Sequence, residues 1–299
     1  MAIKLVAGDI APIMQIGLRS TFAALVLAVV VGRAEGGRAF RDGTALPGLI
    51  VGLLFAGEFL FVAQGLLYTT ASHMSVFLYT APIFAALGLH WLLPEERMQP
   101  LQWLGVAVAF GGIGVAFLGG GSGAAGGTVA GGTVAGGTMA GGTAAAGINM
   151  LLGDAMGLAA GLLWGATTVA IRKTSLSEAA PSKTLFYQMA VASVVLLAYA
   201  AFTGQHGIRY TQAAVLSVAF QSVVVALSSY LAWFWLLRRY LASRLSILSF
   251  MTPLFGVSFG VLILDEPLDR HFVLGAVMVL AGITLVSGAG LLREKLRRR

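Results

Sequence analysis

The 299-residue chain is too apolar for a soluble protein, because 58% of its residues are hydrophobic and only 10% are charged. A soluble domain of this length needs a charged shell of about a quarter of its residues. The formal net charge of +7 does not predict nucleic-acid binding, since the basic residues lie between apolar runs and in the C-terminal tail. The lack of cysteine excludes disulfides, a thiolate nucleophile and cysteine-ligated metal sites.

The apolar residues are grouped in runs that are long enough to cross a hydrocarbon core of about 30 Å. A bilayer offers backbone groups no hydrogen-bond partner, so each run is predicted to be an α-helix. No cleavable signal peptide is expected, because the first run carries Arg19 and further spans follow it. The nine predicted spans are 12–31, 47–68, 73–93, 100–118, 151–171, 183–203, 212–237, 245–264 and 271–292.

A glycine-rich stretch from Gly119 to Asn149 interrupts this series, with repeated Ala-Gly-Gly-Thr-x units between Ala125 and Ala144. Glycine at this density does not fix a helix, so the stretch is predicted to be a flexible linker. A phosphate-binding loop is the alternative, but no Lys-Ser/Thr follows the glycines.

The sequences on the two sides of this linker match each other, which predicts an internal repeat. The matched segments are 71–75 with 242–246, 81–84 with 252–255, and Ala11-Pro12 with Ala180-Pro181. Leu104-Gly105 and Gly112-Ile113 likewise match Leu274-Gly275 and Gly282-Ile283. We divide the chain into a first repeat (1–118), a linker (119–149), a second repeat (150–292) and a basic tail (293–299).

The second repeat holds a complete helix at about 151–171, whose counterpart in the first repeat would lie almost wholly before Met1. Five helices per repeat predict ten, and the chain shows nine spans and a stub. A missing first helix is the expectation; a true nine-helix protein is the alternative.

The basic residues predict the orientation of the chain. If the C-terminus is cytoplasmic, fifteen Lys and Arg residues lie inside and only Arg209 and Arg270 lie outside. Repeats of five helices, an odd number, must then be inverted relative to each other. Inverted repeats are common in secondary transporters.

Taken together, these features resemble the EamA-type carriers of the drug/metabolite transporter superfamily. The resemblance rests on the doubled five-helix pattern, Leu18-Arg19, Leu163-Trp164-Gly165, and a fourth helix with Pro82 or Pro253 that closes on Glu95 or Glu266. It implies an all-α membrane fold that exports amino acids, other metabolites or drugs. It also implies a bacterial inner-membrane location, and it names no substrate.

Two charges inside spans, Arg19 and Glu58, are the clearest candidate site residues, because an ionised side chain there costs on the order of 3 kcal/mol. Arg19 is predicted to anchor a carboxylate and Glu58 to take a proton or a substrate amine. A structural Arg19–Glu58 pair is the alternative. The equivalent positions in the second repeat, Gln188 and Ser229, are neutral.

Other features fill out a candidate cavity. Pro82 and Pro253 are expected to kink equivalent helices at mid-span. Paired kinks of this kind indicate a midplane binding site, and the alternative is that they only shape the helix bundle. Glycines at every fourth position, such as Gly153 and Gly157, are interpreted as helix packing. The remaining candidate lining residues are aromatic or amide side chains: Phe59, Gln64, Tyr79, Trp164, Tyr187, Tyr230, Trp233 and Phe250.

Neither an enzyme nor a metal site is predicted, because the four histidines are scattered and no Gly-x-Ser-x-Gly segment is present. The predicted function is alternating-access transport of a small organic metabolite, with the lipid bilayer as partner and protons as a candidate coupling ion. No cofactor is expected. The alternatives are a nucleotide-sugar or sugar-phosphate carrier of the same fold, a channel, or a non-transporting membrane protein.

Overall fold

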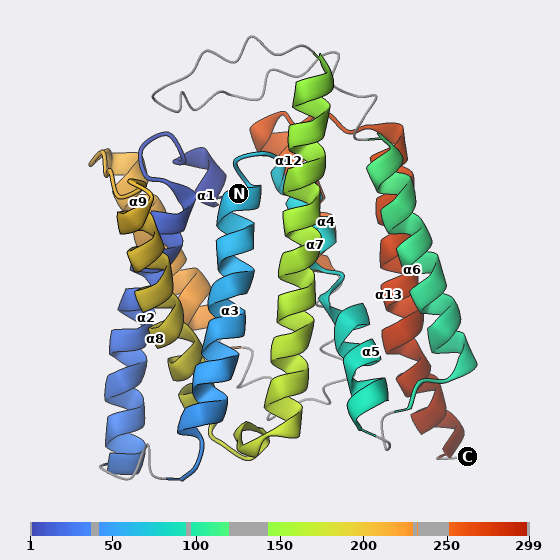
Figure 1. Ribbon diagram of the computed structural model, residues 1–299, viewed down its shortest axis with the longest axis horizontal. Helices are drawn as coiled ribbons and strands as arrows, with labels where there is room; N and C mark the ends of the chain where they lie inside the picture. The colour runs from blue at the N-terminus through green and yellow to red at the C-terminus, as the bar shows by residue number, and fades with distance from the viewer. Residues whose placement is uncertain are drawn as a thin grey trace. The chain divides into compact units, whose positions relative to one another are not determined.

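The computed structural model describes residues 2–36, 42–93, 97–119, 143–229, 232 and 251–297. Within these ranges the secondary structure is helical, apart from one isolated bridge between Ile10 and Ile208. Figure 1 shows the helices. Their bounds are α1 Ala2–Leu5, α2 Pro12–Glu35, α3 Ala45–Gly65, α4 Ala71–Leu78, α5 Ala81–Leu92, α6 Pro100–Gly119, α7 Thr143–Lys173, η3 Ser175–Ser177, α8 Pro181–Phe202, α9 Gln212–Phe220, η4 Gln221–Ser229, α12 Met251–Leu264 and α13 Arg270–Arg297.

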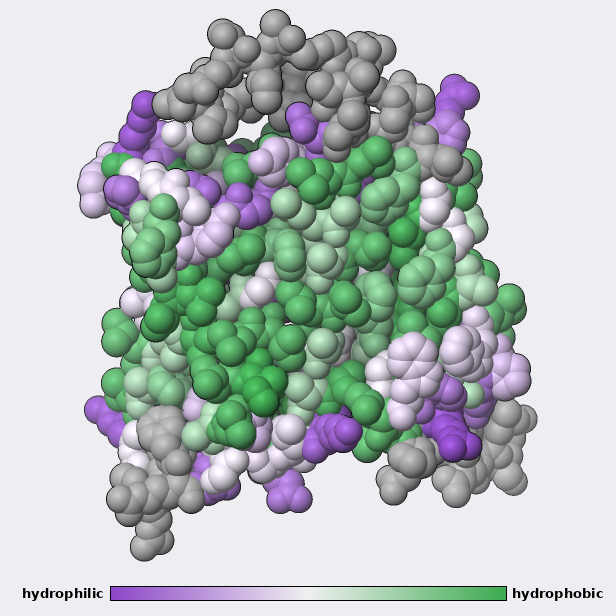
Figure 2. Space-filling view, viewed as in Figure 1, coloured by the Kyte–Doolittle hydropathy of each residue, from purple (hydrophilic) through white to green (hydrophobic). Residues whose placement is uncertain are grey.

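Eight of the described spans are long and apolar enough to cross a membrane, and α12 is a shorter apolar helix. These nine segments correspond to the nine predicted spans, although the last part of 212–237 and the first part of 245–264 lie outside the described residues. Large apolar side chains such as Leu25, Val194 and Leu262 are exposed, as a lipid-facing surface requires. Figure 2 shows hydrophobic residues over most of the visible face and hydrophilic ones toward its ends.

Two helices extend beyond their predicted ends. Helix α7 begins at Thr143, inside the predicted linker, where Ala144, Ala145 and Ala146 favour a helix. Helix α13 continues to Arg297, through most of the predicted tail, because 289–297 contains only one glycine and no proline to end it.

The chain divides into two compact units, each built from both repeats. The α6–α13 unit comprises Gln64–Leu162 and Ser243–Arg299. The α2–α8 unit comprises Ala2–Ala63 and Leu163–Ala242. Each unit therefore contains equivalent helices from both repeats, and their packing reveals how the repeats are related.

In the α6–α13 unit, the equivalent helices α6 and α13 pack backbone to backbone. A Cβ added at Gly105 would lie 2.8 Å from the carbonyl oxygen of Gly282, and one at Gly112 would lie 2.7 Å from that of Gly275. Gly105 matches Gly275 in the repeat, and Gly112 matches Gly282, so the two contacts are reciprocal. The two helices run antiparallel, as halves related by a two-fold axis in the membrane plane must.

The α2–α8 unit shows the same relation between its equivalent helices. Both helices begin with a proline in the first turn after an alanine. Gly17 packs on Leu197, and the hydroxyls of Thr21 and Ser193 lie 2.6 Å apart, so α2 and α8 also run antiparallel. The predicted inverted repeat is confirmed.

The span that contains Pro82 was expected to kink there, and in the structure it is divided into two helices. Helix α4 ends at Leu78, and α5 starts at Ala81 with Pro82 in its first turn. Proline lacks the N–H that a continuous helix would need there. Pro253 lies in the first turn of α12 and is buried, while 233–250 lie outside the described residues.

The glycine ladder of α7 is confirmed as a packing surface. A Cβ at Gly153 would lie 2.7 Å from the backbone nitrogen of Thr69, and one at Gly161 would lie 2.9 Å from the carbonyl oxygen of Phe77. Close backbone approach of this kind is the usual role of small residues between membrane helices.

Candidate functional site

Arg19 of α2 and Glu58 of α3 are both buried in the α2–α8 unit, with 9% and 4% of their surfaces exposed. The Arg19 guanidinium interacts electrostatically with the Glu58 carboxylate. Its Cζ atom also lies 4.7 Å from the centroid of the Phe59 ring. This geometry is a cation–π contact, which gains strength where water is excluded. The structure thus brings three predicted site residues together.

One oxygen of this pair has no partner. Glu58 Oε2 is buried and accepts no hydrogen bond from any described residue. A buried acceptor without a donor costs about 1–3 kcal/mol, and more when the group is charged. The unpaired oxygen does not stabilise the fold, so it is suited to accept a hydrogen bond from a bound solute.

Two amides that the sequence analysis did not single out continue this polar region. Gln15 lies one turn before Arg19 on α2, and Gln221 begins the π-helix η4. The Gln221 Nε2 atom donates to Gln15 Oε1 at 2.8 Å. In the sequence these residues are neutral amides within apolar spans, and a neutral amide indicates a functional site less strongly than a charged residue does.

The other predicted site residues of this unit lie apart from Arg19 or use their polar groups locally. The Tyr187 hydroxyl lies 3.1 Å from Thr44 Oγ1, and its ring packs on Gly48, about 15 Å along α3 from Glu58. Gln188 follows Tyr187 on α8 and is half-buried. Ser229 is exposed, and its hydroxyl donates to the Val225 carbonyl.

Trp164 is a half-buried residue of α7 in the same unit. Tyr230, Trp233 and Phe250 lie outside the described residues.

Four predicted residues belong to the α6–α13 unit: Gln64, Tyr79, Pro82 and Pro253. Tyr79, at the α4–α5 break, shares a side-chain hydrogen bond with Thr252, which precedes Pro253. The two proline segments are therefore joined. Gln64 is a half-buried residue near the end of α3.

The same unit contains a buried acid cluster that the sequence analysis missed. Asp154 is fully buried and accepts hydrogen bonds from Thr69 Oγ1 and, at 2.9 Å, from His73 Nδ1. The His73 ring stacks on Phe272, with centroids 3.7 Å apart. The members are far apart in sequence, so no spacing motif marks them. Because the Asp154 carboxylate is hydrogen-bonded through both oxygens, this cluster ties helices together.

Glu266 performs a related role at the start of α4. Its carboxylate accepts from the Ala71 and Ser72 backbone N–H groups at 2.7 and 2.9 Å, and from the Ser72 hydroxyl at 2.7 Å. A carboxylate at a helix N-terminus satisfies free N–H groups and complements the helix dipole.

An ion pair fixes the connection before α3 to the start of α8. The Lys183 ammonium, 1% exposed, donates to Asp42 at 2.6 Å. This hydrogen bond, with a second from Thr44, holds the pKa of the Asp42 carboxyl well below its usual range. The pair lies at the opposite end of α3 from Glu58.

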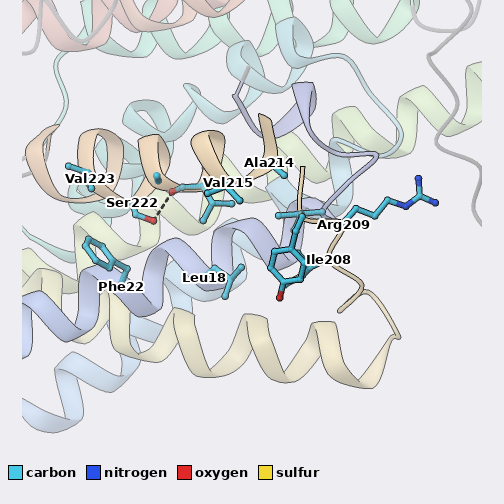
Figure 3. A pocket seen from close by; sticks show the side chains of 12 residues that line it. Leu18, Phe22, Ile208, Arg209, Ala214, Val215, Ser222 and Val223 are labelled. Carbon is cyan, nitrogen blue, oxygen red and sulfur yellow. Dashed lines mark hydrogen bonds between the residues drawn. The ribbon is translucent and has the colours of Figure 1, made fainter. Parts of the chain in front are cut away.

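Among the described residues, no three His, Asp or Glu side chains gather into a group that could hold a metal ion. A pocket of about 370 Å³ lies between α2 and α9 in the α2–α8 unit, lined by apolar side chains such as Leu18 and Phe22 (Figure 3). The Arg209 side chain extends away from this lining in Figure 3.

The chain is similar to several proteins named as uncharacterized transporters. It is 24% identical to one from Archaeoglobus fulgidus over 79% of this chain and 72% of that protein. It is 24% identical to YoaV of Bacillus subtilis over 95% and 89%, and 29% identical to one from Synechocystis over 83% and 72%. A solved crystal structure shares the fold, with a TM-score of 0.62 at 19% identity over 98% of this chain and 92% of that one.

The EamA-like transporter family matches residues 1–118 and 151–288, which are the two repeats on either side of the glycine-rich segment. This family consists of integral membrane transporters rather than enzymes. With most of its length matched, the inverted repeat in place and transporters as its relatives, the chain belongs to the EamA-like transporter family.

Proposed function

We propose that this membrane transporter is a secondary carrier of a small organic solute and that Arg19, Glu58 and Phe59 bind that solute. The observation that carries the proposal is the buried Glu58 Oε2 atom, which has no donor among the described residues. An ionisable residue within a membrane span is costly and usually marks a substrate or ion pathway.

Alternating access is the mechanism that an inverted repeat supports, because the same fold can open to either side of the membrane by exchanging the conformations of its halves. Within this scheme Arg19 orients an acidic group and keeps the Glu58 carboxylate compensated. Phe59 supplies an apolar wall. The basic-residue distribution supports a cytoplasmic C-terminus in a bacterial inner membrane.

A purely structural Arg19–Glu58 pair is the competing interpretation. Breaking a buried pair by removing one member costs about 3–5 kcal/mol, and removing both members recovers much of that loss. A binding role predicts the opposite pattern, since Glu58→Gln removes a charge that serves the solute and leaves the fold intact.

The experiment combines stability with transport. Wild type, Arg19→Gln, Glu58→Gln and the double variant are purified, their melting temperatures are measured, and uptake of a solute panel is followed in proteoliposomes with and without a proton gradient. We expect wild-type uptake above that of empty vesicles, and Glu58→Gln to keep its melting temperature while losing uptake. A large fall in the melting temperature of each single variant, recovered in the double variant, with uptake retained, contradicts the binding role.

A further inference from the structure

Four polar side chains of the α2–α8 unit form two interacting pairs, Glu58 with Arg19 and Gln15 with Gln221, which we treat as one row. The row runs from Glu58 on α3 through Arg19 and Gln15 on α2 to Gln221 on η4. Gln15 and Arg19 are four residues apart on α2, so they lie on the same face of the helix, with Cβ atoms about 5–6 Å apart. All four are buried, and Gln15 and Gln221 are 0% and 1% exposed.

The hydrogen bonds of the row fix which way both amides point. Gln15 Nε2 donates to the carbonyl oxygens of Ile3 and Ile10, at 3.0 and 2.8 Å. Its Oε1 atom must therefore be the one that accepts from Gln221. Gln221 Nε2 also donates to Ser217 Oγ at 3.1 Å, and that hydroxyl donates in turn to the Ala2 carbonyl. Flipping Gln15 would place its oxygen against two carbonyl oxygens, and flipping Gln221 would place its oxygen against Gln15 Oε1.

This orientation leaves the Gln221 Oε1 atom buried and without a donor. In the part of the chain that the structure describes, Glu58 Oε2 and Gln221 Oε1 are the two buried side-chain atoms that lack a hydrogen-bond partner. Both belong to the same row. Both are acceptors, so the row lacks hydrogen-bond donors rather than acceptors.

A proton alone does not complete the row. Protonation of Glu58 turns one unpaired acceptor into a donor but brings no proton to Gln221 Oε1 unless the two side chains meet. An ammonium group brings up to three N–H donors together with a positive charge that matches Glu58. The helix that carries Gln221 is a π-helix, a rare form that is frequently found at functional sites.

We propose that the row Glu58–Arg19–Gln15–Gln221 binds a protonated amine, with its ammonium on Glu58 and a second N–H donor on Gln221. The proposal rests on the proposed function and names the substrate class. A compact organic diamine or amino-amide has both donors. A solute that has only hydrogen-bond acceptors would leave Glu58 Oε2 and Gln221 Oε1 unpaired, so such a solute is excluded.

The test uses four probes of similar size on the purified full-length chain and in proteoliposomes. They are 1,4-diaminobutane, butylamine, 1,4-butanediol and the bis-trimethylammonium analogue of the diamine. The last has the charges of the diamine but no N–H groups. We expect 1,4-diaminobutane to raise the melting temperature in proportion to the logarithm of its concentration and to be taken up. Butylamine should act more weakly, and the other two should have no effect.

Two variants assign the donors to residues. Gln221→Leu should weaken 1,4-diaminobutane binding roughly tenfold but leave butylamine binding almost unchanged, because only the second donor is lost. Glu58→Gln should abolish the effect of both amines. Gln102→Leu is the matched control, because Gln102 Nε2 donates to the Val286 carbonyl in the α6–α13 unit. It should leave amine binding at the wild-type level.

The outcomes separate this inference from the function on which it rests. Uptake of other solutes without any response to amines overturns the amine site but keeps the carrier. Stabilisation by 1,4-diaminobutane without uptake keeps the amine site and overturns the carrier. An equal response to the bis-trimethylammonium analogue shows that charge, not N–H donation, is recognised, and it also overturns the inference. If no probe or solute raises the melting temperature or is taken up, both the amine site and the carrier function are overturned.

Discussion

Substitution of Glu266 should destabilise the α6–α13 unit more than any change at an exposed helix cap. The carboxylate is 7% exposed and joins the segment after α12 to the start of α4 through three hydrogen bonds. In Glu266→Ala all three bonds are lost, and the buried N–H groups of Ala71 and Ser72 lose their acceptor. The expected cost is about 3–5 kcal/mol, comparable with breaking a buried ion pair. Glu266→Gln keeps one acceptor oxygen, so its cost should be about 1–3 kcal/mol.

The assay is thermal unfolding of the purified protein, read by a probe of tertiary structure. One kcal/mol corresponds to roughly 2–4 °C for chains of 150–250 residues, so Glu266→Ala should lower the melting temperature by roughly 6–20 °C. Asp269→Asn is the matched control. Asp269 accepts from the His271 backbone N–H at 3.0 Å at the start of α13, but it is partly exposed, and asparagine caps as well as aspartate. Equal small shifts for Glu266→Gln and Asp269→Asn would refute the bridging role.

Three further predictions concern packing, pH and topology. Gly112→Ala should destabilise the protein by about 1–3 kcal/mol, because its Cβ meets the Gly275 carbonyl, whereas Gly114→Ala on the same helix meets nothing within 4 Å and should be neutral or stabilising in the same unfolding assay. Asp42→Asn should lower stability at neutral pH; since the folded pKa of Asp42 is depressed, its contribution is present above pH about 4 and is lost as the pH falls further, so the variant should show a shallower acid transition. A reporter that is active only after export should stay silent when fused after Arg299, and strong activity would contradict a cytoplasmic C-terminus.

The helices and their inverted relation could be predicted from the sequence because the bilayer permits few alternatives. An apolar run of about 20 residues has to be a helix, and internal matches such as Gly105 with Gly275 define the repeat. The interruption before Pro82 followed from the missing N–H of proline. The start of α7 was predicted too late in the sequence, because alanines at the end of the glycine-rich segment extend the helix.

Apart from Phe59, the candidate site could be predicted only where it carries charge. Arg19 and Glu58 stood out because ionised groups are costly in a span, and the structure places them together. Gln15 and Gln221 did not stand out, since a neutral amide in an apolar run has no distinct pattern and the π-helix is not readable from periodicity. Tyr187 was chosen for its type, but its hydroxyl is paired with Thr44 far from Glu58. Residue type alone does not reveal which polar group is already satisfied.

Comparison of equivalent positions in the α2–α8 unit shows which residues the fold requires and which it does not. Helices α2 and α8 begin alike and pack antiparallel, yet the positions that match Arg19 and Glu58 are the neutral Gln188 and Ser229. The Ser229 hydroxyl is satisfied by the Val225 carbonyl of its own helix, while Glu58 Oε2 has no partner among the described residues. Because the second copy of the repeat forms the equivalent helices with neutral residues at these two positions, helix formation and pairing do not require a charge there. The two unpaired acceptors, Glu58 Oε2 in the first repeat and Gln221 Oε1 in the second, lie at positions that the repeat does not match to each other. An asymmetric solute requires an asymmetric site of this kind.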